Sequence, residues 1–203
     1  EDKDSTGTLK YNSIAMIGPA VDVKFENNMF LKGSLLFATV DHVYSYFVSP
    51  ADNEQDEISS RTDLDIMAGY MFTRKFGAFV GYKSRTADFT VENPIGTVVL
   101  TSDLKIKGPG IGVLGNIPVN ETVTLYGSLG WMFLDTEATW AGGSVSEDMD
   151  GPSAEIGAVF NTSPHTAITV GYKYEKFSGT YSDGSGSFDE TLAGVTAGFN
   201  YTF

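Results

Sequence analysis

The sequence lacks cysteine and has no long hydrophobic run. None of its 203 residues is Cys, which excludes disulfides and thiol chemistry. No stretch of 18 or more apolar residues occurs, so no transmembrane helix is encoded. A mean hydropathy of −0.07 would ordinarily favour a soluble protein. A β-barrel escapes this test, because its lipid-facing and lumen-facing residues alternate and cancel. No signal peptide is visible, and we expect any such segment to have been removed.

Basic residues are also scarce. The chain has 13 Lys and Arg against 26 Asp and Glu, a net charge of −13, which excludes nucleic acid as a partner. The acidic residues cluster between the apolar segments, at 1–4, 52–57, 135–137, 147–150 and 183–190. We interpret these clusters as long solvated loops on the outer side. Binding of cations, such as divalent ions shared with lipopolysaccharide, is the alternative.

The last eight residues alternate apolar with polar or small side chains. Successive side chains of a strand point to opposite faces, so Ala197, Phe199, Tyr201 and Phe203 share one face. An aromatic face of this kind suits a strand laid against lipid. The pattern also resembles the C-terminal signal by which the barrel assembly machinery recognises bacterial outer-membrane β-barrels. The positions that fit this signal are Thr196, Gly198, Tyr201 and Phe203.

Alternation with a period of two recurs along the whole chain. It predicts nine strands, at 9–25, 29–48, 59–73, 76–91, 98–117, 122–140, 151–162, 166–181 and 188–203. Each is longer than the roughly 9–11 residues that cross a bilayer at a tilt. Short connections alternate with longer ones at 49–58, 92–97, 141–150 and 182–187. Together these features predict an all-β protein, a transmembrane antiparallel up-and-down β-barrel forming a single domain over residues 1–203.

An internal repeat bears on the number of strands. Gly81-Tyr82-Lys83 matches Gly171-Tyr172-Lys173, which indicates a four-strand unit used twice. Counting back from a periplasmic C-terminus, the first strand runs toward the periplasm. Barrels of this kind have an even number of strands, so we expect ten strands in the intact protein. Eight strands remain the alternative if one predicted strand has been wrongly split.

Strand parity separates a lipid face from a lumen face. The lipid face includes the predicted interfacial aromatics Tyr70, Phe72, Trp131, Phe133, Tyr172, Tyr174 and Phe199. The lumen face carries charges of both signs, namely Asp63, Asp65, Lys83, Arg85, Asp103, Lys105, Glu155, Lys173 and Glu175. An unpaired charge in a narrow lumen would cost several kcal/mol. Neighbouring strands carry opposite charges, so that Asp63 and Asp65 lie beside Lys83 and Arg85, and Glu155 lies beside Lys173. We therefore expect a lumen closed by ion pairs, with an ion-selective path as the alternative.

Candidates for catalysis are few. His165 lies in a predicted periplasmic turn. His42 lies near the outer end of its strand, where its neighbour Asp41 points to the opposite face and cannot orient it. The sequence shows no metal-ligand spacing, no phosphate-binding loop and no nucleophile elbow. We therefore expect no enzyme, no cofactor and no metal site.

Across nearly its whole length the chain resembles the small OmpA-type outer-membrane β-barrels, including the OmpX and OmpW relatives. The resemblance rests on the architecture, the C-terminal signal and the repeated Gly-Tyr strands. It implies a structural or surface-exposed barrel in the bacterial outer membrane, in contact with lipopolysaccharide and open to protein partners at its acidic loops. A narrow channel or a conduit for small or hydrophobic solutes is a second possibility. In that case Pro19, Pro109 and Pro152 could open the wall sideways. An outer-leaflet lipid-modifying enzyme is the third.

Overall fold

The computed structural model describes residues 7–8, 16–39, 42–49, 52–92, 98–182 and 186–201. It describes the side chains of residues 16–39, 60–88, 101–182 and 186–199. The strands are β1 (Gly7–Thr8), β2 (Met16–Ile17), β3 (Ala20–Lys24), β4 (Met29–Ala38), β5 (His42–Ser49), β6 (Asp52–Met71), β7 (Phe76–Glu92), β8 (Val98–Pro118), β9 (Val123–Trp140), β10 (Gly143–Asn161), β11 (Thr166–Thr180) and β12 (Ser187–Tyr201). No helix in the described ranges is long and apolar enough to cross a membrane.

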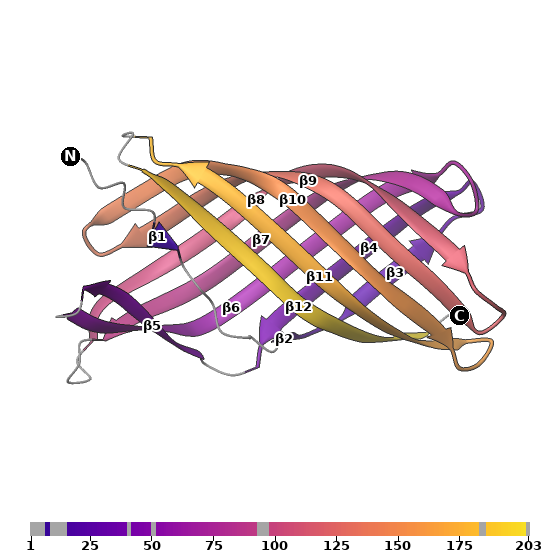
Figure 1. The fold of residues 1–203 in the computed structure, drawn as a ribbon, viewed down its shortest axis with the longest axis horizontal. Coiled ribbons are helices and arrows are strands. Elements are labelled where there is room, and N and C mark those ends of the chain that lie inside the picture. The colour runs from indigo at the N-terminus through magenta and orange to yellow at the C-terminus, as the bar shows by residue number, and fades with distance from the viewer. Residues whose placement is uncertain are drawn as a thin grey trace.

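All twelve strands belong to one sheet, which curls into a barrel of steeply tilted strands (Figure 1). From β4 through β6 to β12, each strand pairs antiparallel with the next. β2 and β3 both pair with β4, and β5 pairs with the outer part of β6. The all-β barrel of nine predicted segments is thereby confirmed. The predicted segment 9–25 is divided at Gly18-Pro19, and the segment 29–48 is divided after Ala38.

The two edges of the sheet run in the same direction. Counting through the antiparallel ladders, β3 and β12 both run toward the end that carries the short turns, and β1 pairs with the start of β12 in parallel. Only a strand antiparallel to both edges could join them with regular antiparallel ladders. The tenth strand stays a prediction.

Several predicted outer loops are in fact strand. β6 begins at Asp52, and β9 and β10 form a hairpin that turns at Ala141-Gly142, so 52–58 and 143–150 are not loops. The sequence prediction was wrong here because the apolar alternation stops at these positions. Above the bilayer the outward face of a strand meets water instead of lipid, so the strand continues without that signal. The segment 93–97 lies outside the described residues, as do residues 183–185 of the predicted loop between β11 and β12.

The outward face of the sheet is apolar over a broad band. Exposed side chains on this face include Val80, Ile111, Leu129, Ile156 and Val195. All seven predicted interfacial aromatics are exposed there as well, from Tyr174 at 38% to Phe199 at 69%. Such exposure would be unfavourable in water but is expected of side chains that face lipid.

On the inner face, large rings lie over glycines of neighbouring strands. The Phe79 ring crosses Gly112 and Gly130, and the Tyr126 ring crosses Gly157 and Gly171. A glycine opposite an aromatic leaves the space that the ring fills, so these pairs pack the lumen against its wall.

Replacing Gly112 with alanine is expected to lower the free energy of unfolding by about 1–3 kcal/mol, because the methyl group would meet the Phe79 ring and lie 2.5 Å from the Leu129 carbonyl oxygen. The control is Gly194→Ala on β12, where no atom lies within 4 Å of the new methyl group; it should change stability by less than about 0.5 kcal/mol. Urea unfolding of both variants in lipid vesicles measures the difference. Equal stabilities would contradict the packing.

Candidate functional site

A cluster of charged side chains fills the middle of the lumen. Its members come from β6, β7, β11 and β12, and they are Arg61, Asp63, Asp65, Lys83, Arg85, Lys173, Glu175 and Glu190. Four are basic and four acidic, so the cluster is neutral as a whole. β6 and β7 are neighbours, whereas β11 and β12 lie across the lumen from them, so the ion pairs span the barrel. We call this set the ion cluster.

Arg85 lies at the centre of the ion cluster. Its side chain is 2% exposed, and its guanidinium contacts three carboxylates. Nε lies 3.3 Å from Asp63, Nη2 lies 3.1 Å from Glu175, and Nη1 pairs with Glu190. Asp63 is the register partner of Arg85 on β6, while the two glutamates come from the far wall. A planar guanidinium can serve several acceptors at once, which an ammonium group cannot do as rigidly.

Two lysines complete the bridge across the lumen. Lys83 Nζ lies 2.5 Å from Asp65 and 3.1 Å from Glu175. Lys173 Nζ lies 2.6 Å from the same Asp65 and 3.2 Å from the same Glu175. Each of these carboxylates therefore meets two ammonium groups, and Glu175 is fully buried. Asp65 and Lys173 are less enclosed, with 30% and 25% of their side chains exposed, so water reaches this side of the cluster.

The sequence predicted part of this cluster. The pairs Asp63 with Arg85 and Asp65 with Lys83 are confirmed. Glu155 was expected to pair with Lys173, its register partner. Lys173 instead turns to Asp65, and Glu155 accepts hydrogen bonds from the Tyr126 hydroxyl at 2.9 Å and from Thr196 at 3.4 Å.

Two predicted lumen charges face outward. Asp103 and Lys105 on β8 are exposed. The next residue on the strand, Ile106, is 2% exposed and faces inward. The prediction was wrong because it took every charge on a strand as a sign of the lumen. β8 is 21 residues long, so its outer half extends past the bilayer, where outward charges meet water.

The sequence reasoning missed three inward polar residues. Arg61 shares the parity of Asp63 and binds it in bidentate fashion at 3.0 and 2.8 Å, so its position on the strand could have revealed it. Glu190 was assigned to an outer loop, yet it lies on β12 with 6% exposure. The third is Tyr126, and nothing in the sequence around it distinguishes it from other tyrosines on strands.

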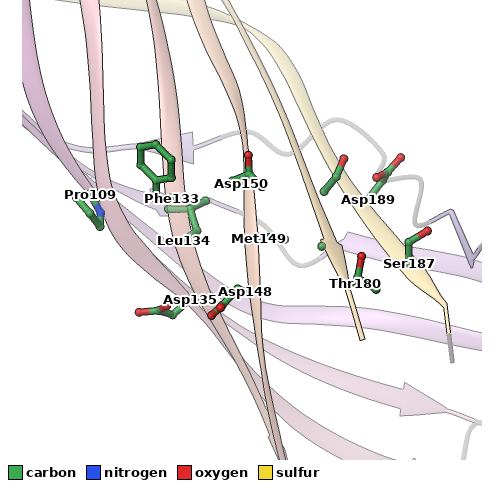
Figure 2. A pocket seen from close by; sticks show the side chains of 12 residues that line it. Pro109, Phe133, Leu134, Asp135, Asp148, Met149, Asp150, Thr180, Ser187 and Asp189 are labelled. Atoms are coloured by element: carbon green, nitrogen blue, oxygen red, sulfur yellow. The ribbon is translucent and has the colours of Figure 1, made fainter. Parts of the chain in front are cut away.

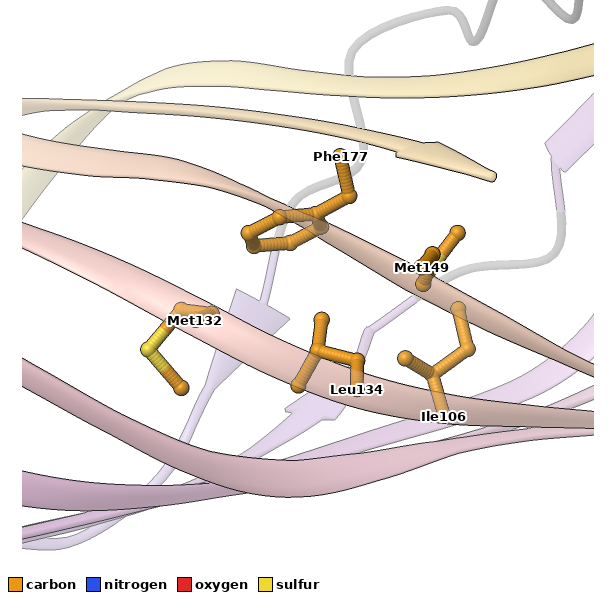
Figure 3. Packing of buried hydrophobic residues seen from close by; sticks show 5 residues of the cluster. All are labelled: Ile106, Met132, Leu134, Met149 and Phe177. Atoms are coloured by element: carbon orange, nitrogen blue, oxygen red, sulfur yellow. The ribbon is translucent and has the colours of Figure 1, made fainter. Parts of the chain in front are cut away.

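Apolar side chains cover the ion cluster toward the outer end. Ile106, Met132, Leu134, Met149 and Phe177 form a buried group, each at most 6% exposed (Figure 3). A second group, of Phe30, Phe79 and Leu114 with Met67 and Met71 against it, lies toward the end with the short turns. We call them the outer and inner apolar clusters. On β7, Lys83 and Arg85 follow Phe79 of the inner apolar cluster. On β11, Lys173 and Glu175 precede Phe177 of the outer apolar cluster, so the ions lie between the two apolar layers.

A hollow of about 970 Å³ lies beside the outer halves of β8–β12 (Figure 2). Most of its lining residues have outward parity, and four are aspartates: Asp135, Asp148, Asp150 and Asp189. Asp150 accepts a hydrogen bond of 2.7 Å from the indole of Trp131, one of the interfacial aromatics. The hollow therefore begins where the apolar band ends.

The Gly-Pro pairs interrupt the wall without opening it. Pairing is interrupted at Gly108-Pro109 between β8 and β9, and at Gly151-Pro152 between β10 and β11, while the register is the same on both sides of each gap. At each glycine a methyl group would collide with a carbonyl oxygen of the neighbouring strand, so the two backbones lie unusually close. The sideways opening considered for the prolines is thus not formed at these two positions.

The remaining predicted sites are only partly described. His165 is exposed in the turn before β11, at the same end as the other short turns. The side chain of His42 lies outside the described side chains, as does that of Tyr201. Thr196 faces the lumen and Gly198 follows on the same face of β12, while Phe203 lies outside the described residues. No group of three His, Cys, Asp or Glu that could hold a metal ion occurs among the residues that the structure describes.

Comparison with known proteins adds a family and a fold. A family model described as "Outer membrane protein beta-barrel domain" matches residues 19–203. No curated protein matches the chain. The outer membrane protease OmpT from Escherichia coli is similar in structure, with a TM-score of 0.66 and 14% identity over 95% of this chain and 85% of that one. At this identity the likeness shows the fold alone.

Two smaller structures show weaker similarity. Ail, the attachment invasion locus protein of Yersinia pestis, has a TM-score of 0.45 and 18% identity over 87% of this chain and 99% of its own. OprG of Pseudomonas aeruginosa has a TM-score of 0.43 and 17% identity over 86% of this chain and 95% of its own.

Proposed function

Because the chain belongs to the family of outer-membrane protein β-barrel domains, we propose that it serves as a non-enzymatic structural and surface barrel with a closed lumen. The protein is located in the outer membrane. The observation that carries the proposal is the ion cluster, in which Arg85, Lys83 and Lys173 join opposite walls. A solute would have to break several buried, charge-assisted contacts to pass.

The outer part of the barrel supports a surface role. β6, β8 and β10 contain 20, 21 and 19 residues, about twice what a tilted strand needs to cross lipid. The excess forms a sheet beyond the bilayer, and its outward carboxylates include Asp103, Asp135 and Asp148. We infer that this surface meets lipopolysaccharide, through shared divalent cations, or protein partners. The barrel assembly machinery would recognise the end of β12.

A narrow channel is the second candidate, and one observation favours it. The partial exposure of Asp65 and Lys173 supports access of water to the ion cluster from one side, in which case only the ion cluster and the outer apolar cluster would have to rearrange. The non-enzymatic assignment is a prediction, since the side chain of His42 is not described.

Single-channel recording in a planar bilayer separates the two candidates. We expect the wild type to be silent and Lys83→Ala/Lys173→Ala to conduct, because the variant removes the ammonium groups that bridge Asp65 and Glu175. The control is Lys105→Ala/Lys107→Ala, which removes the same charge from the exposed face of β8 and should stay silent. Heat-modifiable migration on gels confirms that each variant has folded. Steady conductance of the wild type would place the channel first.

A further inference from the structure

We propose that the outer part of the β9–β10 hairpin, residues 132–151, is a hinged flap that closes the lumen from outside. The hairpin is regular within itself. Its register runs without a shift from Gly143 opposite Trp140 to Phe160 opposite Val123. An unbroken two-stranded ladder moves as one piece, so any motion must occur where the hairpin joins its neighbours.

Both junctions of the hairpin are interrupted by the same dipeptide. On the β8 side, strand pairing stops at Lys107 opposite Asp135 and resumes in the same register at Gly110 opposite Met132. On the β11 side, it stops at Asp150 opposite Ser178 and resumes at Ser153 opposite Glu175. The gaps hold Gly108-Pro109 and Gly151-Pro152. Proline has no N–H to give to a ladder, so each gap is a line along which the sheet can bend.

The two junctions differ in strength beyond the gaps. Toward β8, pairing continues from Lys107 to Ser102, which lies opposite Trp140 at the tip. Toward β11, two register pairs follow in the part of the chain that the structure describes, Asp150 with Ser178 and Met149 with Gly179. Among the described residues, one further tie is visible, in which Glu147 accepts hydrogen bonds from the backbone N–H and the hydroxyl of Ser182 at 2.9 and 3.0 Å. The seam between β10 and β11 is thus the weaker one.

The inner face of the flap is what seals the lumen. Met132, Leu134 and Met149 supply three of the five residues of the outer apolar cluster, and they pack against Ile106 and Phe177 (Figure 3). Apolar contacts are non-directional, so they can be broken and re-formed without precise alignment, and the methionine side chain adapts to different surroundings. Parting β10 from β11 withdraws this face and uncovers the ion cluster, in which Glu190 is the register partner of Phe177.

The test combines an engineered disulfide with methionine oxidation. Because the chain contains no cysteine, two introduced cysteines can form a disulfide only with each other within the chain. Asp150→Cys/Ser178→Cys joins register partners across the weak seam, whereas Asp135→Cys/Asp148→Cys joins partners inside the hairpin. Both variants, with their disulfides formed, are placed in nanodiscs and treated with hydrogen peroxide. Peptide mass spectrometry follows sulfoxide formation.

We expect oxidation of Met132 and Met149 to be at least tenfold slower with the seam disulfide than with the hairpin disulfide. Met67 and Met71, in the inner apolar cluster, should oxidise equally in both and serve as the internal reference. Equal rates at Met132 and Met149 in the two variants would overturn the flap, as would their complete inertness in the wild type.

A second variant keeps the test decisive if the seam disulfide fails to form. Glu147→Ala removes a half-buried carboxylate near the tip of the hairpin that ties β10 to Ser182, and it should leave the fold intact. Oxidation of Met149 is expected to rise at least threefold, again relative to Met67. An unchanged rate would count against a flap that opens at this seam.

Discussion

Replacing Arg85 with alanine is expected to lower the free energy of unfolding by about 3–5 kcal/mol, the usual cost of removing one partner from a buried ion pair. The guanidinium is the contact that Asp63, Glu175 and Glu190 share. Without it, three carboxylates would remain close together in a buried region. The effect is measured by urea unfolding in lipid vesicles, followed by the fluorescence of the two tryptophans.

The matched control for Arg85→Ala is Lys176→Ala. Lys176 pairs with Asp189 at 3.3 Å on the outward face, with 45% and 43% of the two side chains exposed. An exposed pair contributes at most about 1 kcal/mol, so this variant should stay close to the wild type. If Arg85→Ala were equally mild, the lumen would have to be wet enough to screen its charges, and the closed-lumen proposal would fail.

A second substitution tests the origin of the loss. The hydrogen bond that the structure gives Glu190 comes from Arg85, and its Oε2 has no hydrogen-bond partner among the described residues. Adding Glu190→Gln to Arg85→Ala removes one of the stranded charges, so part of the lost stability should return. No recovery would mean that lost packing of the arginine, rather than unpaired charge, dominates the effect.

Leu129→Arg is expected to destabilise the barrel by about 2–4 kcal/mol, the cost of a cation facing the middle of the bilayer. Leu129 is 57% exposed on the outward face of β9. Its register partners are Val113 and Ala154, so nothing beside it could pair with the new charge. The readout is the same unfolding assay in vesicles, with the folded fraction checked on gels.

Thr139→Arg on the same strand and the same face provides the control. At about 3.3 Å per residue, Thr139 lies roughly 33 Å further along the strand than Leu129, which a tilt of about 40° reduces to roughly 25 Å along the membrane normal. Because Leu129 faces the middle of an apolar band about 25 Å tall, Thr139 lies beyond this band. Its register partner Asp103 is one of the charges that the sequence placed wrongly in the lumen. We expect a change below about 1 kcal/mol. A large loss here would place the outer half of β9 within lipid.

Much of the barrel wall could be predicted from the sequence. Within the bilayer, one face of each strand meets lipid and the other meets the lumen, so the environment imposes a period of two that the sequence must follow. That is why the parity of Tyr70, Trp131 and Phe199 gave the correct face, and why Asp63 and Lys83 were placed inside. Beyond the bilayer this constraint ends, and there the predictions for Asp103, Lys105 and the strand bounds were wrong.

The tertiary structure alone decided which charges meet. Asp65 binds Lys173, 108 residues further along the chain, and Arg85 binds Glu190, 105 residues further along. Such pairs depend on how the sheet curls and on the height at which opposite walls face each other, and no local pattern carries that information. Within the bilayer, the sequence by itself determined which face of each strand points inward. Curvature and strand stagger determined that charges on these faces join into one ion cluster, because closure brings β6 and β7 opposite β11 and β12.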